Sequence, residues 1–360
     1  LVYMGKIKGF LFAVRHREIL MTDLGLTPGK RLKQLREHRQ LSLAQLASCL
    51  DRPLSRQSIA KYEADIMLPR YSVLQSLCKA LCISPEYILR GCDYQFSIPQ
   101  YRNRSGNAIP PAVLETLLAE TNTWLASYLH AESLGHRTMN FVNPLEHLTI
   151  HNKKDTEQAA ITLRQAWNMG DGPDMSLCHL AERKGIVLFS TPLPQKLLGI
   201  SLWANNNRPV VLLNFDERDT TVERLRFTLA HELGHLFLKF ATNLDFVCKR
   251  PDDNPEEKLC EIFAGNLLMP RATMYEELGR HRNFLTLEEL IELRELYGVS
   301  ISALVHQAHD LGIITDEHYN WWYDERINKN KREDGWGQYP VPEKLTKEIR
   351  LKVIENIKYQ

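Results

Sequence analysis

The sequence predicts a multidomain chain in which a small all-α domain is followed by an α+β domain. Residues 27–91 have the pattern of short amphipathic helices with tight turns between them, and residues 92–111 are polar and contain prolines. Beyond residue 172, three short strand-like runs lead into a long helix that is apolar nearly all round. The 360 residues are enough for two cores, since a domain usually takes about 100–200 residues.

Charge and cysteine content narrow the classes of partner. The formal net charge is +1, yet residues 28–90 hold eleven Lys and Arg against five Asp and Glu, which favours a nucleic-acid partner for the first domain only. The seven cysteines form no CxxC pair, and we interpret them as reduced core thiols of a cytoplasmic protein. Apolar runs fall short of the roughly 20 residues that span a bilayer, so no membrane partner is expected.

The first domain shows the capping pattern of short helices. Ser42 with Gln45 predicts the start of the second helix, and Ser55 predicts the start of the third. In the third helix Ile59 and Tyr62 fall on the apolar face. The opposite face of this helix carries the polar residues Arg56, Gln57, Ser58 and Lys61. We expect these residues to contact DNA, together with Gln45 of the second helix.

Residues 29–91 resemble the Xre/lambda-repressor helix-turn-helix family, including an IxxYE step and the later LPRYSVLQSLCKALCISPEYIL. The resemblance implies a double-stranded DNA operator as partner, read by the third helix in the major groove. Because such readers often pair on palindromic sites, a homodimer is one expected arrangement. The alternative is a helical bundle used only for protein dimerisation.

The rest of the chain gives the following expected elements. Helices are predicted at about 112–133 and 155–168, and strands at 185–190, 199–204 and 210–215, with a turn at 205–207. The next helix starts near Thr220, where Thr220 and Glu223 fit a capping box, and runs to about Phe240. Further helices are expected at about 255–268, 287–296 and 301–311, followed by a charged and aromatic tail that ends in a helix.

The long apolar helix contains His231-Glu232-Leu-Gly-His235. Residues i and i+4 lie on one face of a helix, so both imidazoles can reach one tetrahedral Zn²⁺ ion, and Glu232 is placed to accept a proton from water. Two histidines and a carboxylate in a buried helix need compensation, which a metal provides for all three. The alternative is a hydrogen-bonded pair of core histidines beside a surface glutamate.

A catalytic zinc usually has three protein ligands, and the next helix offers candidates. Asn254 and Pro255 predict its start. Glu256 and Glu257 both stand at helical spacing from the apolar stripe, so periodicity does not separate them. We favour Glu257 as the metal ligand because Glu261, four residues later, could orient a histidine ligand. Alternatively, these acids only favour the positive end of the helix.

The combination of RFTLAHELGHLFL with ExxCxxFAGNLLMP resembles the ImmA/IrrE family of zinc metallopeptidases, over about residues 155–315. The resemblance implies a zincin-like, gluzincin-type fold with Glu232 as general base and with His231, His235 and Glu257 as zinc ligands. It also implies a protein substrate, a DNA-binding repressor whose cleavage releases stress-response or mobile-element genes. One departure is Gln307, which stands where an arginine is usual before Ala308.

The oxyanion-stabilising group is left open among candidates chosen by residue type: His306, His309, Tyr319 and Tyr323. An extended substrate could add to an exposed strand edge, for which the strand at 199–204 is the candidate. Without turnover, the chain would instead be a zinc-containing transcription factor, an antitoxin or a phage-defence regulator.

These observations together predict five regions. They are an N-terminal extension (1–26), the helix-turn-helix domain (27–91), a linker and connecting helix (92–152), the peptidase domain (153–315) and a C-terminal tail (316–360).

Overall fold

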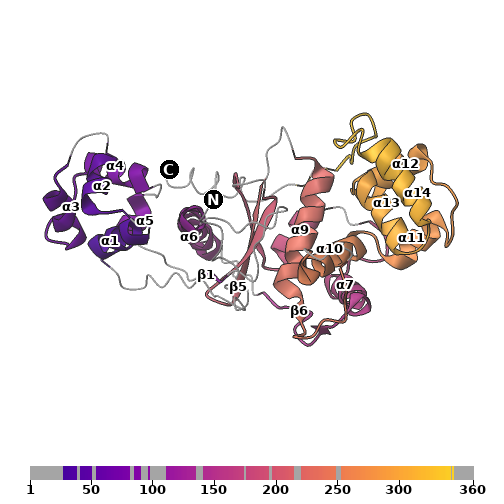
Figure 1. The fold of residues 1–360 in the computed structure, drawn as a ribbon. Coiled ribbons are helices and arrows are strands. Elements are labelled where there is room, and N and C mark those ends of the chain that lie inside the picture. The colour runs from indigo at the N-terminus through magenta and orange to yellow at the C-terminus, as the bar shows by residue number, and fades with distance from the viewer. Residues whose placement is uncertain are drawn as a thin grey trace. The chain divides into compact units, whose positions relative to one another are not determined.

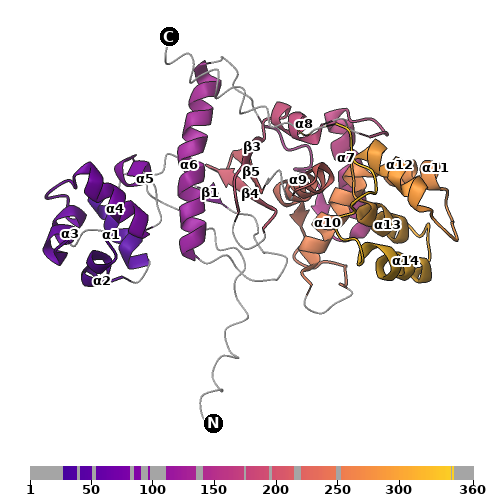
Figure 2. The same cartoon turned by 90° about the horizontal axis from the view of Figure 1, so that it is seen from above.

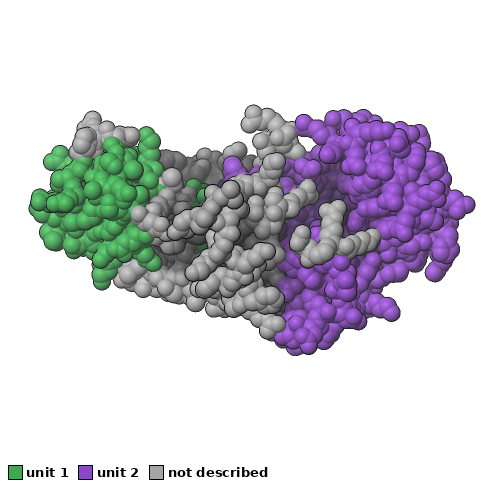
Figure 3. Space-filling model, in the orientation of Figure 1, with its two compact units in different colours: residues 1–101, 110–127, 203–206 green, residues 102–109, 128–202, 207–360 purple. Residues whose placement is uncertain are grey.

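The computed structural model describes most of the chain between residues 27 and 343 (Figures 1 and 2). The described ranges are 27–38, 41–50, 54–81, 85–90, 96–97, 111–134, 141–173, 176–193, 197–214, 220–248, 253–341 and 343. The proposed N-terminal extension, most of the linker and the expected C-terminal helix lie outside them. The chain divides into two compact units: residues 1–101, 110–127 and 203–206 form unit 1, and the remainder forms unit 2 (Figure 3).

Unit 1 contains the five short helices that the sequence predicts. They are α1 (Pro28–His38), α2 (Leu43–Ser48), α3 (Arg56–Glu63), α4 (Tyr71–Leu81) and α5 (Pro85–Arg90). Leucines from α1, α2 and α4 pack with Ile59 of α3 in one buried core. Both expected caps form, since the Ser42 side chain accepts from Gln45 N and the Ser55 side chain accepts from Ser58 N.

A buried ion pair fixes α3 against α1. Arg36 Nε lies 2.6 Å from Glu63 Oε1 and Arg36 Nη2 lies 2.8 Å from Glu63 Oε2, so the pair is bidentate. Its hydrogen bond to Glu63, opposed by burial, raises the pKa of Arg36. Asp65 follows α3 and accepts a hydrogen bond from Gly29 N at the start of α1. The orientation of α3 is therefore set at its C-terminal end, which leaves its N-terminal residues on the surface.

A four-stranded sheet has the order β1-β4-β5-β3. The long helix α6 (Pro111–Leu134) and the helices α7 (Lys153–Trp167) and α8 (Leu177–Arg183) lie between β1 and β3 in the chain. Its strands are β1 (Phe96–Ser97), β3 (Val187–Ser190), β4 (Gly199–Ala204) and β5 (Arg208–Leu213). β3 and β5 are parallel, with Val187 opposite Val210. Asn205 and Asn206 adopt φ of 49° and 57° in the turn between β4 and β5, which asparagine tolerates better than most residues. The three strands and the turn that the sequence predicts are confirmed.

In unit 2, α9 (Val222–Phe237) packs on β5 and against α10 (Pro255–Leu268), as Figure 1 shows. The short strands β2 (Thr149–Ile150) and β6 (Lys239–Phe240) pair in parallel, which ends α9 before the predicted Phe240. The remaining elements are α11 (Arg271–Leu278), α12 (Leu287–Tyr297), α13 (Ile301–Asp310), α14 (Asp316–Trp322) and the π-helical turn η1 (Tyr323–Ile327). In the described part of the chain, no helix is both long and apolar enough to cross a bilayer.

The predicted capping box at the start of α9 is wrong by one residue. The N-cap is Thr221, whose side chain accepts from Arg224 N at 3.3 Å, whereas the Thr220 hydroxyl donates to Asn214 O. Glu223 is unavailable for a capping box because it is buried, with Oε1 accepting from Arg294 Nε and from Tyr339 N. Burial by itself would raise the pKa of Glu223, but a hydrogen bond from its own backbone N–H, together with Arg294 and the Tyr339 N–H, holds this pKa below its usual range.

The segment that the sequence suggests is a tail packs into unit 2 as far as Glu343. Arg294 joins Glu223 to Glu333, whose carboxylate also accepts from Ile301 N and Ser302 N at the start of α13. Glu343 pairs with Arg226 of α9 at 2.5 Å and accepts from Leu177 N and Cys178 N at the start of α8. The N-terminal half of α9 is therefore held by buried charges from the end of the chain.

We predict that Glu343→Ala destabilises unit 2 by about 3–5 kcal/mol, because it leaves the buried Arg226 guanidinium without its carboxylate. The side chains of this pair are 1% and 0% exposed. Chemical denaturation followed by circular dichroism measures the change. The matched control is Glu325→Ala, which removes the exposed pair with Lys329 and should cost less than about 1 kcal/mol. Equal effects of the two variants would show that the Arg226–Glu343 pair does not stabilise the unit.

Candidate metal centre

The helix α9 is buried on nearly every face because its apolar residues surround it. Leu225, Leu229 and Leu233 are at most 2% exposed, and Glu232 and His235 are only 6% and 8% exposed. His231 is partly exposed. Polar side chains in such a helix require partners, because burying an unpaired polar group costs free energy. Glu232 and His235 therefore need polar or charged partners on a neighbouring element.

That neighbouring element is α10, which begins as the sequence predicts. The Asn254 side chain accepts from Glu256 N, and Pro255 occupies the first helical turn. Of the two glutamates that periodicity did not separate, Glu257 is the one whose carboxylate lies beside the two rings.

Three potential ligand atoms converge between the two helices. His231 Nε2 and His235 Nε2 lie 3.0 Å apart, and Glu257 Oε2 lies 3.3 Å from the first and 3.5 Å from the second. Metal–ligand distances of about 2.0–2.1 Å place the corners of a tetrahedron about 3.3 Å apart. The donor set of two imidazoles and a carboxylate and its spacing therefore fit Zn²⁺. Within the described residues this is the one cluster of three such side chains.

The electrostatics of the cluster favour a cation. Burial by itself would raise the pKa of Glu257, but hydrogen bonds from His231 and His235 hold the pKa well below its usual range. Burial lowers the pKa of His235, whereas its contacts with Cys260, Glu257 and Glu232 outweigh this and raise it. The carboxylate is therefore ionised, and the site attracts positive charge.

Glu232 lies beside the first residue of β4. A Cβ atom on Gly199 would come within 2.8 Å of Glu232 Cγ and 2.9 Å of Glu232 Oε1. Any larger residue at position 199 would displace the carboxylate, so the glycine is required for this close approach. Sequence analysis did not single out Gly199, because the contact joins two elements that periodicity treats separately.

Two residues of α10, Glu261 and Cys260, follow Glu257 within about one helical turn. Glu261, expected to orient a histidine ligand, has its carboxylate 2.7 Å from Lys258 Nζ. The group beside the second ring nitrogen of His235 is Cys260, whose Sγ lies 3.5 Å from His235 Nδ1. Burial raises the pKa of the Cys260 thiol.

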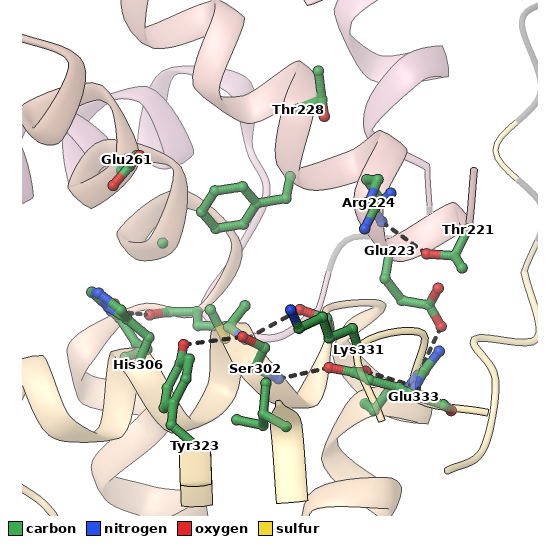
Figure 4. Close-up of a pocket in the computed structure, with 18 of the residues that line it drawn as sticks. Thr221, Glu223, Arg224, Thr228, Glu261, Ser302, His306, Tyr323, Lys331 and Glu333 are labelled. Atoms are coloured by element: carbon green, nitrogen blue, oxygen red, sulfur yellow. Dashed lines mark hydrogen bonds and ion pairs between the residues drawn. The ribbon is translucent and has the colours of Figure 1, made fainter. Parts of the chain in front are cut away.

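A cavity of about 1520 Å³ lies in unit 2, lined in part by residues of α9 and α10 (Figure 4). Its wall includes Thr228, one turn before Glu232 on α9, and Glu261, one turn after Glu257 on α10. Figure 4 shows these two residues facing His306 and Tyr323 across the cavity.

The four oxyanion candidates occupy different positions. His306, Tyr319 and Tyr323 line the cavity, and Tyr323 contacts the hydroxyl of Ser302 at 3.0 Å. His309 pairs with Asp316 at 2.6 Å. The contacts of these four residues do not favour one of them as the group that stabilises the oxyanion. Gln307, at the position where an arginine was expected, donates to Met269 O and Asn266 Oδ1 and so joins α13 to α10.

The predicted DNA-contacting residues of unit 1 lie on its surface. Arg56, Gln57 and Lys61 are exposed on α3, and Gln45 is exposed on α2. Two of the predicted residues also cap helices, since Gln45 Oε1 accepts from Ser42 N and Ser58 lies in the cap of α3. The amide nitrogen of Gln45 is left for a further contact.

Comparison with known proteins matches two parts of the chain. Residues 181–309 match the family model of the IrrE N-terminal-like domain, Peptidase_M78, and residues 29–93 match a helix-turn-helix domain. A crystal structure of the P22 c2 repressor protein in complex with synthetic operator 9T is 29% identical to the matched part of this chain. The match covers 18% of this chain and 97% of that chain, with a TM-score of 0.18. Comparison with curated proteins gave no match. The chain therefore joins a segment that matches a helix-turn-helix domain to a segment that matches the IrrE N-terminal-like domain of Peptidase_M78.

Proposed function

We propose that this protein is a DNA-binding regulator with zinc-dependent endopeptidase activity, which cleaves a partner repressor. The observation that carries the proposal is the convergence of His231, His235 and Glu257, with Glu232 next to the first ligand. The family match to a peptidase supports the same reaction class. Operator binding is supported by the helix-turn-helix match and by the exposed polar face of α3.

The mechanism assigns a role to each of these side chains. A zinc ion held by His231, His235 and Glu257 would polarise a peptide carbonyl and lower the pKa of water to about 7. The Glu232 carboxylate accepts the proton of the attacking water on one of its oxygens. It then delivers that proton to the nitrogen of the leaving amine, so that one peptide bond and one water molecule become a carboxylic acid and an amine.

The substrate segment is proposed to lie along β4. Because Gly199 touches Glu232, a peptide that adds to this part of the strand would bring its backbone to the general base. In the described structure β1 pairs with Trp203 and Ala204 of β4, so the proposed position is restricted to the earlier residues, from Gly199 to Leu202. The cavity beside Thr228 would receive a substrate side chain.

The zinc site is tested by His231→Ala. The purified protein should contain about one zinc ion per chain, measured by inductively coupled plasma mass spectrometry, and His231→Ala should lose it because a three-ligand site becomes a two-ligand site. His309→Ala is the matched control, since His309 pairs with Asp316 outside the cluster. Full zinc content in His231→Ala would exclude the proposed ligand set.

The reaction is tested by Glu232→Gln. This variant should keep its zinc and its DNA binding but lose cleavage by about 10²–10⁴-fold, because glutamine does not accept the proton of water. Cleavage is followed by mass spectrometry after incubation with repressors encoded next to the gene. If Glu232→Gln cleaves as fast as the parent, Glu232 is not the general base. If the parent cleaves none of them while zinc is bound, the alternative of a zinc-containing regulator without turnover is favoured.

The DNA-binding face is tested by a pair of substitutions in α3. The preferred operator is first selected from random double-stranded DNA. Arg56→Ala should then weaken binding by about 1–3 kcal/mol and relax the preference at one base pair. Lys61→Ala should weaken binding to all sequences and lower the salt dependence by about one phosphate contact. Lys33→Ala, at an exposed position of α1, is the control for loss of a positive charge. Equal effects of all three variants would place the recognition surface elsewhere.

A further inference from the structure

The two ring nitrogens of His235 face different groups. Nε2 faces His231 and Glu257, while Nδ1 faces Cys260 Sγ at 3.5 Å. Both residues are buried, with Cys260 at 0% and His235 at 8% exposure. The thiol is therefore on the side of the ring that is turned away from the metal centre, and it is not placed to be a fourth ligand.

A metal on Nε2 fixes the proton of a neutral imidazole on Nδ1. That N–H is buried here and needs an acceptor, since a buried donor without a partner costs free energy. In most histidine sites a carboxylate, a backbone carbonyl or water accepts this proton. At His235 the contact that the structure provides is the sulfur of Cys260, which is a weak acceptor.

The approach of the thiol depends on Gly234. A Cβ atom on Gly234 would lie 3.2 Å from both Cβ and Sγ of Cys260, which is tighter than usual contact. Gly234 precedes the ligand His235, and Cys260 stands three residues after the ligand Glu257. The same close contact between α9 and α10 therefore positions the carboxylate ligand and the sulfur acceptor.

We propose that Cys260 is a positioning residue of the metal centre, which accepts the Nδ1–H of His235 and so fixes the tautomer and the ring orientation of this ligand. This proposal rests on the zinc site of the proposed function. It assigns to a buried cysteine the role that a carboxylate or carbonyl oxygen has elsewhere.

The experiment compares Cys260→Ala, Cys260→Ser and Cys178→Ala in the full-length protein. Zinc affinity is measured by competition with a chromophoric chelator, and the ligand geometry is followed by the absorption spectrum of the Co²⁺-substituted protein. Loss of an outer partner of a ligand typically weakens metal binding about 10–100-fold, and for a weak sulfur acceptor we expect about 10-fold in Cys260→Ala. Cys260→Ser, which restores an acceptor, should recover most of this loss.

Cys178→Ala is the matched control because Cys178 is also 0% exposed but lies on α8. It should lower the melting temperature of the metal-free protein about as much as Cys260→Ala, while leaving zinc affinity and the cobalt spectrum unchanged. If Cys260→Ala binds zinc as tightly as the parent, or if Cys178→Ala weakens zinc binding equally, the role of Cys260 is refuted. If the parent itself binds no zinc, the proposed function fails as well, so the two failures are distinguishable.

Discussion

The metal centre depends on how closely α9 approaches α10. Two of the proposed ligands come from one helix and the third from the other, and a metal site tolerates deviations of only about 0.2 Å in its ligand distances. Gly234 allows this approach because it has no side chain to separate the helices at Cys260. Leu233 and Phe263, both 0% exposed, belong to the buried faces of the two helices. The ligand spacing is thus a result of helix packing, which the metal can use but does not have to create.

The other half of α9 is held by charge. Glu223 and Arg226 are each 1% exposed and pair with Arg294 and Glu343. Replacing such pairs with apolar residues is often neutral or stabilising, whereas removing one partner is costly. These pairs therefore fix the position of the chain more than they add stability. Glu343 also accepts two backbone N–H groups of α8, so the segment that carries it fits here in one register. The helix that carries the metal ligands is fixed at one end by ion pairs and at the other by its packing against α10.

Sequence reasoning reached the elements of the site but only part of its geometry. The helical spacing of His231 and His235 is a local property, and the bounds of α10 follow from Asn254 and Pro255. The choice between Glu256 and Glu257 needed the packing of two helices, as did the contact between Cys260 and His235. Glu343 falls in the segment 316–360 that the sequence analysis assigned to a tail, and its burial depends on partners on α8 and α9 that are at least 117 residues away. Contacts between distant segments are what periodicity and capping rules do not contain.

The spacing of the three side chains supports the proposed metal site over a cluster of hydrogen-bonded core histidines. Each imidazole Nε2 carries at most one proton, so the two rings supply at most two hydrogen bonds for the three mutual contacts. Here all three distances fall between 3.0 and 3.5 Å, and Glu257 Oε2 faces both imidazole nitrogens. Such mutual spacing is the geometry of one face of a tetrahedron with edges of about 3.3 Å. A divalent cation satisfies the three lone pairs at once and neutralises the carboxylate, which a single proton does not achieve.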